Sequence, residues 1–408
     1  MVMVNCGGII SKIIERGTKM SKREVIFIFF LSAVGVQLCA AEEVQWLGYL
    51  SSREASSIVG DMGSQGLKMS SERPEGAELP EFKEEKPFFY EWLSPMVENG
   101  HLLISLDCSR AGGVHDLLYI DSNGDGNLND EEVTEAYRTE SEHSYFGPVR
   151  VTFEGEDGPI SYHLNFRLCD HHDRTLYVYP GGWYEGEITV GGEKKHCVLI
   201  DYNANGAFND KSIEAGKCDR IRIGRKDERD TKYVGNYIEI DGDYYRPEIA
   251  RDGAYIKLEA ADDIRFGKVK MQEAITEFSA GGENGLFAVR LEKGTGELPV
   301  GKYRIDYWAI ERKDEEGSTW ELKGQGFGEK GDFEVNEDGE TELSVGEPVI
   351  CSLGSRERDS SHYFDQGLRG ELGERISLTR SGSRPRAPKL HIKSADGKYD
   401  RTFNFEYG

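Results

Sequence analysis

Strands dominate the pattern of apolar and polar positions along this chain. In the clearest stretch, residues 160–168, one face carries an apolar side chain at every second position, namely Ile160, Tyr162, Leu164, Phe166 and Leu168. The positions between them are polar, so one face of a strand lies in a core and the other in water. Further β-prone runs, such as 101–106 and 117–120, end at residues that favour turns. We therefore predict an all-β protein.

Glycine-containing pairs predict hairpins between several of these runs. The runs 188–190 and 193–200 flank Gly191-Gly192, a two-residue turn, and Asp241-Gly242 and Asp252-Gly253 predict the next two turns. Glycine makes up 49 of the 408 residues, about 12% against a usual ~7%. This excess also favours β architecture with many turns.

The alternation is lost between Leu258 and Phe266, where the chain turns acidic, and we place a domain boundary there. Residues 87–262 form one predicted β domain and residues 263–408 a second, both β-sandwich-like. The segment Leu298-Pro299-Val300-Gly301-Lys302-Tyr303 leads into an alternating strand of the second domain. At the terminus, the alternate aromatics Phe403, Phe405 and Tyr407 predict a strand sealed into the sheet. Residues 42–86 are polar and predict a flexible lead-in that docks by Trp46 and Tyr49.

The N-terminal 41 residues have the order of parts of a secretory signal peptide. A basic stretch at Met20–Arg23 precedes an apolar run, Val25–Val36, and the small residues Cys39-Ala40-Ala41 form the cleavage site. Met20 is a possible true start, because a complete signal follows it. Leu38 before Cys39 argues against a lipoprotein, and no later stretch has the ~20 apolar residues of a membrane span. We expect a secreted or periplasmic bacterial protein.

The chain is acidic, with 50 basic and 74 acidic side chains and a formal net charge of -24. Such a surface repels nucleic acid and favours divalent cations. The predicted mature chain has an odd number of cysteines, which permits one or two disulfides but no dense framework. They are Cys108, Cys169, Cys197, Cys218 and Cys351.

Residues 121–132 have the form of a calcium-coordinating loop that follows a strand. The oxygen ligands expected at positions one, three, five, seven and twelve are those of Asp121, Asn123, Asp125, Asn127 (by its carbonyl) and Glu132. Gly126 makes the sharp turn, and Leu128 is the apolar residue that holds the loop on the fold. An Asx-rich turn without metal is the alternative. One helical turn over 131–137 is a further possibility after the loop.

A weaker copy of this loop begins 80 residues later, also after a strand. Its predicted ligands are Asp201, Asn203, Asn205, Ala207 and Asp210. Position twelve holds Ser212, so Asp210, Glu214 or Asp219 has to complete the shell. Calcium and an asparagine-stabilised turn are equal alternatives here, and we expect the first loop to bind more tightly because it offers more carboxylates.

Other candidate chemistry is sparse. Asp170-His171-His172-Asp173 contains zinc-type ligands, but a solvated loop is the favoured interpretation. Nucleophile-elbow, zinc-protease and phosphate-loop motifs are all missing from the sequence. The aromatics Trp183, Tyr184, Trp308 and Trp320 could stack on sugars, although core packing is commoner in strand-like sequence.

The strand-loop pair, the Leu-Pro-x-Gly-x-Tyr segment and the terminal Phe405-Glu406-Tyr407-Gly408 together resemble uncharacterised secreted bacterial proteins. Those proteins carry EF-hand-type loops and a C-terminal Ig-like or transthyretin-like β-sandwich. The resemblance implies calcium at the first loop, an envelope location and no known activity. We expect a calcium-binding β-protein with a structural or binding role in the envelope, its partner a glycan or another envelope protein. A secreted enzyme or carbohydrate-binding protein acting on glycans is the alternative.

Overall fold

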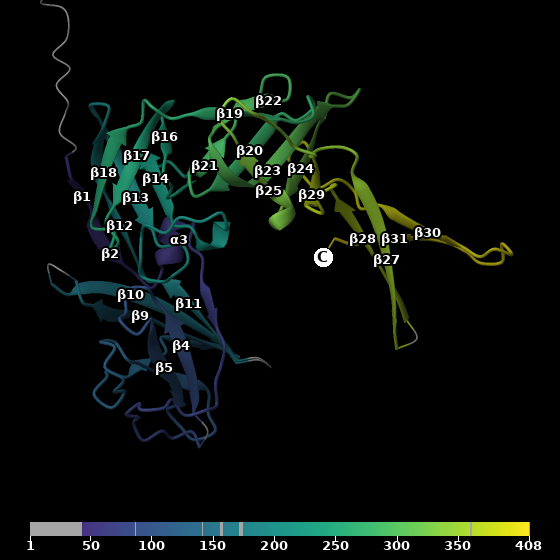
Figure 1. Cartoon of the computed structure of the whole chain (residues 1–408). Coiled ribbons are helices and arrows are strands. Elements are labelled where there is room, and N and C mark those ends of the chain that lie inside the picture. The colour runs from purple at the N-terminus through teal and green to yellow at the C-terminus, as the bar shows by residue number, and fades with distance from the viewer. Residues whose placement is uncertain are drawn as a thin grey trace, which may run out of the picture. The chain divides into compact units, whose positions relative to one another are not determined.

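The computed structural model describes residues 43–407, except residues 86, 141, 156–157, 171–173 and 360. Strands make up 52% of the chain and helix 3%, which confirms the all-β prediction. Figure 1 shows arrows along nearly the whole ribbon from β1 to β31. The predicted signal peptide and cleavage site lie outside the described residues. None of the described helices is long and apolar enough to cross a membrane.

A four-stranded antiparallel sheet flanks the first candidate calcium loop, in the order β4-β5-β6-β7. Its strands are β4 (Phe88–Leu93), β5 (His101–Cys108), β6 (His115–Ile120) and β7 (Thr134–Glu135). β7 pairs with β6 directly after the loop, at Leu117↔Glu135 and Leu118↔Thr134. The helical turn considered for 131–137 is therefore wrong, because this return to the sheet extends the chain.

The alternating stretch 160–168 becomes β10, the central strand of a five-stranded sheet of order β3-β11-β10-β9-β8. The strands are β3 (Gln65–Leu67), β11 (Thr175–Pro180), β10 (Ile160–Cys169), β9 (His143–Phe153) and β8 (Arg138–Glu140). Tyr162, Leu164, Phe166 and Leu168 are all buried, as the period of two predicts.

Two further sheets carry the hairpins predicted from glycine pairs. One has the order β15-β14-β13-β12-β2 and the other the order β1-β18-β17-β16. Their strands are β1 (Gln45–Trp46), β2 (Gly48–Ser51), β12 (Gly182–Val190), β13 (Glu193–Ile200), β14 (Arg220–Gly224), β15 (Lys232–Tyr233), β16 (Ile238–Ile240), β17 (Asp243–Ile249) and β18 (Tyr255–Ala260). Gly191 and Gly192 have φ of 58° and 86°, and Asp241 and Gly242 have 56° and 92°. Positive φ at both central residues is typical of a type I′ turn, so both two-residue hairpins are confirmed.

The segment 43–85 takes part in these sheets, which differs from the flexible lead-in that its polar composition predicts. β1, β2 and β3 pair with β18, β12 and β11, and α3 (Ala55–Val59) lies between β2 and β3. Tyr49 docks as expected, because its hydroxyl accepts the His163 amide at 2.9 Å. Trp46 is 70% exposed, and its ring lies edge-on against the Tyr255 ring. Pairing with distant strands orders a segment that has few apolar residues of its own.

The C-terminal part is built on an eight-stranded sheet, a three-stranded sheet and a separate hairpin. The strands are β19 (Phe266–Lys270), β20 (Glu277–Gly282), β21 (Gly285–Ala288), β22 (Thr295–Pro299), β23 (Gly301–Lys313), β24 (Thr319–Gln325), β25 (Asp332–Val335), β26 (Glu340–Glu342), β27 (Ile350–Arg358), β28 (Ser361–Arg369), β29 (Arg375–Arg380), β30 (Lys389–Lys393) and β31 (Asp400–Asn404). Two short 3₁₀ turns complete the described elements, η1 (Ala215–Lys217) and η2 (Glu329–Gly331).

The C-terminal aromatics are not sealed into a sheet. β31 pairs with β30 alone among the described strands, and Phe403 and Tyr407 are 44% and 51% exposed. A two-stranded hairpin buries little of its own surface, so these aromatics remain partly exposed.

Two large clusters of buried apolar side chains form the core. The first runs from Leu47 to Ile256 and includes Trp92, and the second runs from Val269 to Ile376 around Trp308. The first cluster ends at residue 256 and the second begins at residue 269, and the sequence predicts a domain boundary in this interval. Within the second cluster the Tyr303 hydroxyl donates to the Pro299 carbonyl at 2.8 Å, across the Leu-Pro-x-Gly-x-Tyr segment.

We expect Tyr303→Phe to destabilise the chain by about 1–3 kcal/mol, because the buried Pro299 carbonyl loses its hydrogen bond. The midpoint of urea unfolding measures the loss. Tyr399→Phe is the matched control, since this half-exposed ring lies outside the core and its substitution should change stability by less than about 0.5 kcal/mol. Equal midpoints for the two variants would show that the Tyr303 bond contributes nothing.

Candidate functional site

Asp121, at the first position of the first loop, lies directly after β6 and is buried. Its carboxylate accepts the backbone amides of Gly124 at 2.8 Å, Asp125 at 3.1 Å and Gly126 at 3.0 Å. An ionised carboxylate has about four lone-pair positions. Three are used by the turn amides, and the fourth accepts no further hydrogen bond among the described residues.

The side chains at positions three and five of this loop are held by Asx turns. The Asn123 carbonyl oxygen accepts the Asp125 amide at 3.1 Å, and Asp125 Oδ1 accepts the Asn127 amide at 2.9 Å. Asn123 Nδ2 also donates to Asp125 Oδ2 at 3.0 Å. The two side chains are thus neighbours, as calcium coordination and a metal-free turn both require.

The carboxylate that closes the first loop is Glu131. Its Oε1 accepts the Ser122 amide at 2.6 Å and its Oε2 accepts the Ser122 hydroxyl at 2.8 Å. Glu132, the predicted position-twelve ligand, is exposed. The EF-hand turns residue twelve inward on its exiting helix. Here β7 follows instead, so the neighbouring glutamate is the one that faces the loop.

Leu128 anchors the loop as predicted. It is fully buried against Phe89, Leu103 and Tyr119, on a face of the sheet opposite the main core. Its amide donates to the Glu78 carbonyl at 2.8 Å. The loop is therefore fixed at its apolar position as well as at Asp121.

The second loop has the same backbone conformation at its turning points. Ala204 and Gly206 have φ of 57° and 91°, against 79° and 81° for Gly124 and Gly126 at the same positions. Asp201 accepts the Gly206 amide at 2.6 Å, as Asp121 accepts that of Gly126. The repeat seen in the sequence is thus also a repeat of the turn geometry.

Asp201 is buried more deeply than Asp121. Its side chain is fully buried, and Oδ2 accepts the Tyr162 hydroxyl from β10 at 2.7 Å. Phe208, at the position of Leu128, packs edge-on against Tyr162 and Tyr184 with ring centroids 6.1 Å and 5.1 Å apart. The second loop therefore lies in the main core, where the first loop lies on an outer face.

Two further aspartates close the second loop. Asn203 and Asn205 both donate their side-chain amides to Asp210 Oδ2, at 2.8 Å and 2.6 Å. Asp219 accepts the Tyr202 amide at 3.0 Å and the Asp210 amide at 2.8 Å. Asp219 thus holds the second residue of its loop as Glu131 does in the first, whereas Glu214 pairs with Lys217 on the surface.

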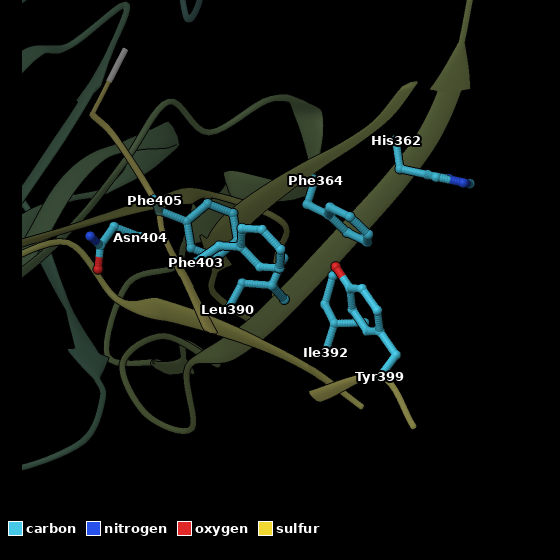
Figure 2. A pocket seen from close by; sticks show the side chains of 8 residues that line it. All are labelled: His362, Phe364, Leu390, Ile392, Tyr399, Phe403, Asn404 and Phe405. Atoms are coloured by element: carbon cyan, nitrogen blue, oxygen red, sulfur yellow. The ribbon is translucent and has the colours of Figure 1, made fainter. Parts of the chain in front are cut away.

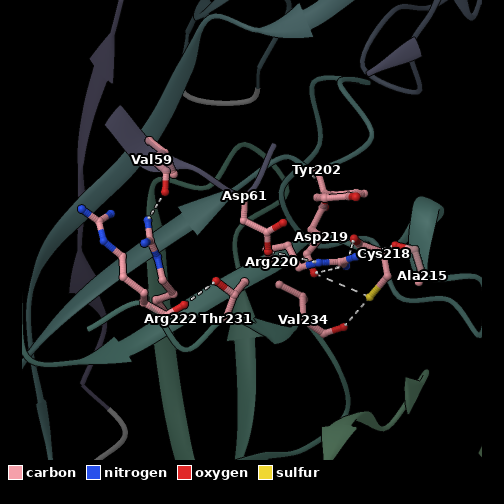
Figure 3. Close-up of polar contacts among 11 residues, drawn as sticks. Val59, Asp61, Tyr202, Ala215, Cys218, Asp219, Arg220, Arg222, Thr231 and Val234 are labelled. Atoms are coloured by element: carbon pink, nitrogen blue, oxygen red, sulfur yellow. Dashed lines mark hydrogen bonds and ion pairs between the residues drawn. The ribbon is translucent and has the colours of Figure 1, made fainter. Parts of the chain in front are cut away.

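Arg220 braces the segment that carries Asp219 (Figure 3). Its guanidinium lies between the Tyr202 and Tyr233 rings, 4.0 Å and 4.1 Å from their centroids. It donates to the carbonyls of Cys218 and Ala215, the latter at 2.7 Å. Because these donors are turned to backbone oxygens, they neutralise none of the loop carboxylates directly.

Burial raises the pKa of these carboxyl groups. It raises the pKa of Asp201 to about 7, with nearby Asp210 adding to the effect. It also raises the pKa of Asp219 well above the ordinary range, and Asp201 and Asp210 contribute further. In the first loop burial raises the pKa of Asp121 and of Glu131. A cation would offset the cost of keeping these groups ionised.

The aromatic side chains considered for sugar stacking are mostly core residues. Trp183, Tyr184 and Trp308 are buried, and the Trp308 indole donates to Glu374 at 3.1 Å. Trp320 is half-buried and its indole donates to Asp314 at 2.9 Å. Core packing, the commoner arrangement, holds for the first three.

A different set of aromatics lines a groove that the sequence did not reveal. The groove has a volume of about 660 Å³ and is lined by β28, the β30–β31 hairpin and the chain just after it. Its lining is made of His362, Phe364, Leu390, Ile392, Tyr399, Phe403, Asn404 and Phe405. Figure 2 shows Phe403, Phe405 and Leu390 gathered at one end and Phe364, Ile392 and Tyr399 at the other. Large apolar pockets with a few polar groups are typical of ligand sites.

All five cysteines of the described chain are free, so no disulfide considered from the sequence is formed there. Of the run 170–173, only Asp170 is described, and it pairs with Arg174 and His115. Comparison of the chain with protein-family models, with curated proteins and with solved structures yields no match.

We expect thermal stability measured with a chelator to fall as pH rises from about 4 to about 7. The raised pKa of Asp201 means that the folded chain holds a proton that the unfolded chain has already lost in this window. Asp201 and Asp219 are buried carboxyl groups whose pKa values are both raised, so both contribute to this fall. Asp201→Asn removes one of them and should flatten the dependence of the melting temperature on pH.

Asp241→Asn is the matched control, because Asp241 is exposed in a hairpin turn and lies outside both loops. It should leave the slope unchanged. If the melting temperatures of wild type and Asp201→Asn depended equally on pH, the raised pKa of Asp201 would not be the cause of the fall.

Proposed function

We propose that this chain is a calcium-binding β-protein of the secreted or periplasmic compartment, with a structural or binding role in the cell envelope. The observation that carries the proposal is the hydrogen bonding of the first aspartate in each loop. Asp121 and Asp201 each accept three hydrogen bonds, from the turn or from Tyr162, and keep one lone-pair position. Two loops 80 residues apart with this arrangement favour a cation over two unrelated turns.

The residues fit the oxygen preference of calcium. In the first loop Asp121, Asn123, Asp125 and the Asn127 carbonyl would hold the ion, with Glu131 or Glu132 completing the shell. In the second loop the donors are Asp201, Asn203, Asn205, the Ala207 carbonyl, Asp210 and Asp219. Two asparagine side-chain amides donate to Asp210 Oδ2 in the second loop, whereas Asp125 in the first loop accepts one, which favours the first as the tighter site.

The domain arrangement belongs to the same proposal. We infer a β-sandwich-like domain over 87–262, which holds both loops, and an Ig-like or transthyretin-like sandwich over 263–408. The Tyr303–Pro299 bond supports the second inference, because Ig-like sandwiches use a tyrosine hydroxyl to hold backbone a few residues upstream.

A second candidate function is glycan binding at the aromatic groove. The half-exposed Tyr399 and Phe403 offer ring faces, and His362 and Asn404 lie at the margins as polar partners. Aromatic faces that bind sugars need this combination of an apolar surface and a polar rim.

We expect calorimetric titration with calcium to resolve a tighter and a weaker site, with affinities near the extracellular range of roughly 10⁻⁴ to 10⁻³ M. Asp121→Ala should abolish the tighter isotherm, because the position-one carboxylate is lost. Asp201→Ala should change only the weaker phase, and Asp241→Asn should change neither. A tight site that survives Asp121→Ala and disappears with Asp201→Ala would reverse the ranking, and a wild-type chain that binds no calcium would remove the proposal.

For the groove, Phe364→Ala should weaken binding of a glycan selected on an array at least tenfold. The matched control is Tyr363→Ala on the same strand, because adjacent strand residues point to opposite faces and Tyr363 does not line the groove. Glycan binding lost equally in both variants, or an array with no signal, would argue against a sugar site here.

A further inference from the structure

Three side chains with metal-binding chemistry meet at the turn end of the β5–β6 hairpin. The ligand atoms of Glu84, Cys108 and His115 all lie within 4.8 Å of one another. We propose that these three residues form a zinc-binding site separate from both calcium loops. The site uses none of the loop residues, so zinc binding here can be tested independently of calcium binding at the loops.

Strand pairing brings the sulfur and the imidazole together. Cys108 is the last residue of β5 and His115 the first of β6, and they are partners across the antiparallel ladder. The register shifts between Asp107 and Cys108, and such a bulge re-aims a side chain. Both Cys108 and His115 are buried.

Asp107 positions the third ligand, Glu84. Its buried carboxylate accepts the backbone amides of Lys83 at 3.0 Å and Glu84 at 2.9 Å. This fixes the preceding segment over the end of β5, with Glu84 Oε2 3.8 Å from Cys108 Sγ. Zinc–sulfur and zinc–oxygen bonds of about 2.3 and 2.1 Å at a tetrahedral angle place the two ligand atoms about 3.6 Å apart, close to this distance.

His115 supplies the observation that points to a ligand. Its Nδ1 lies 2.9 Å from Asp170 Oδ2, and a carboxylate at this distance favours the tautomer with the proton on Nδ1. Nε2 is then left with its lone pair, and this buried atom has no hydrogen-bond partner in the described structure. Leaving a buried polar atom unpaired is destabilising. A metal ion at Nε2 removes that cost, and a carboxylate on the far nitrogen is the usual support of a metal-bound histidine.

The donor set selects zinc over calcium. Calcium takes six to eight oxygen ligands, whereas thiolate, imidazole and carboxylate are the zinc ligands. The thiolate and carboxylate together cancel the charge of Zn²⁺, which suits a site with two buried ligands. The three residues of the cluster leave a fourth position for water.

A nucleophilic role for the same residues is less favoured. Cys108, His115 and Asp170 are the residue types of a cysteine-hydrolase triad. Such a thiol needs contact with substrate, and the Cys108 side chain is fully buried. Glu84 beside the sulfur would also oppose the thiolate unless a cation lay between them.

The test uses the full chain, stripped of metal and kept in excess calcium so that oxygen-only sites are occupied. Titration with Zn²⁺ should show one equivalent bound, and Co²⁺ in its place should give a thiolate-to-cobalt charge-transfer absorption. Cys108→Ala should abolish the absorption. Glu84→Gln, on a partly exposed segment with little risk to folding, should weaken Zn²⁺ binding at least tenfold.

Asp170→Asn tests the positioning role, with an expected 10- to 100-fold loss of Zn²⁺ affinity. Cys197→Ala is the matched control, because Cys197 is also fully buried but lies in β13, outside the cluster. It should keep the absorption. No zinc bound by the wild type, absorption that survives Cys108→Ala, or absorption lost equally in Cys197→Ala would each overturn the proposal.

Discussion

The acceptance of turn amides by a buried carboxylate is the interaction on which the loop architecture depends. A sharp turn after a strand leaves several amides pointing inward, and Asp121 and Asp201 each collect those of the following residues. Without such an acceptor, each buried amide would cost about as much as a lost hydrogen bond. The apolar residues Leu128 and Phe208 then fasten the same turns to the fold.

The two loops differ in depth, and their chemistry differs with it. The second loop lies in the main core, where Tyr162 and Asp219 meet Asp201 and the surrounding burial raises the pKa of both acids. The first loop is at an outer face, where Asp125 is exposed although Asp121 is buried. The same turn is thus placed in two environments, one in the core and one at an outer face.

The two kinds of candidate metal site in this structure differ in their donor atoms. Both loops offer oxygen atoms alone, whereas the β5–β6 turn gathers sulfur, nitrogen and one carboxylate. The first loop and the cluster lie at opposite ends of β6, because Asp121 follows its last residue and His115 is its first. A single strand therefore joins the first loop and the cluster, which are the two sites proposed for different metals, in an acidic chain of net charge -24.

The sequence by itself determined the local features of this protein. Period-two alternation identified β10, glycine pairs located the hairpins at Gly191-Gly192 and Asp241-Gly242, and Asx spacing located both loops, because each depends on neighbours a few residues apart. Tertiary structure decided which carboxylate closes each loop. Strand β7 in place of a helix presents Glu131, and the turn braced by Arg220 brings in Asp219. The partnership of Glu84, Cys108, His115 and Asp170 spans 86 positions, and the groove is lined jointly by β28 and the distant β30–β31 hairpin. Contacts between such distant residues are set by strand pairing and by what covers each face, and neither is encoded in local spacing.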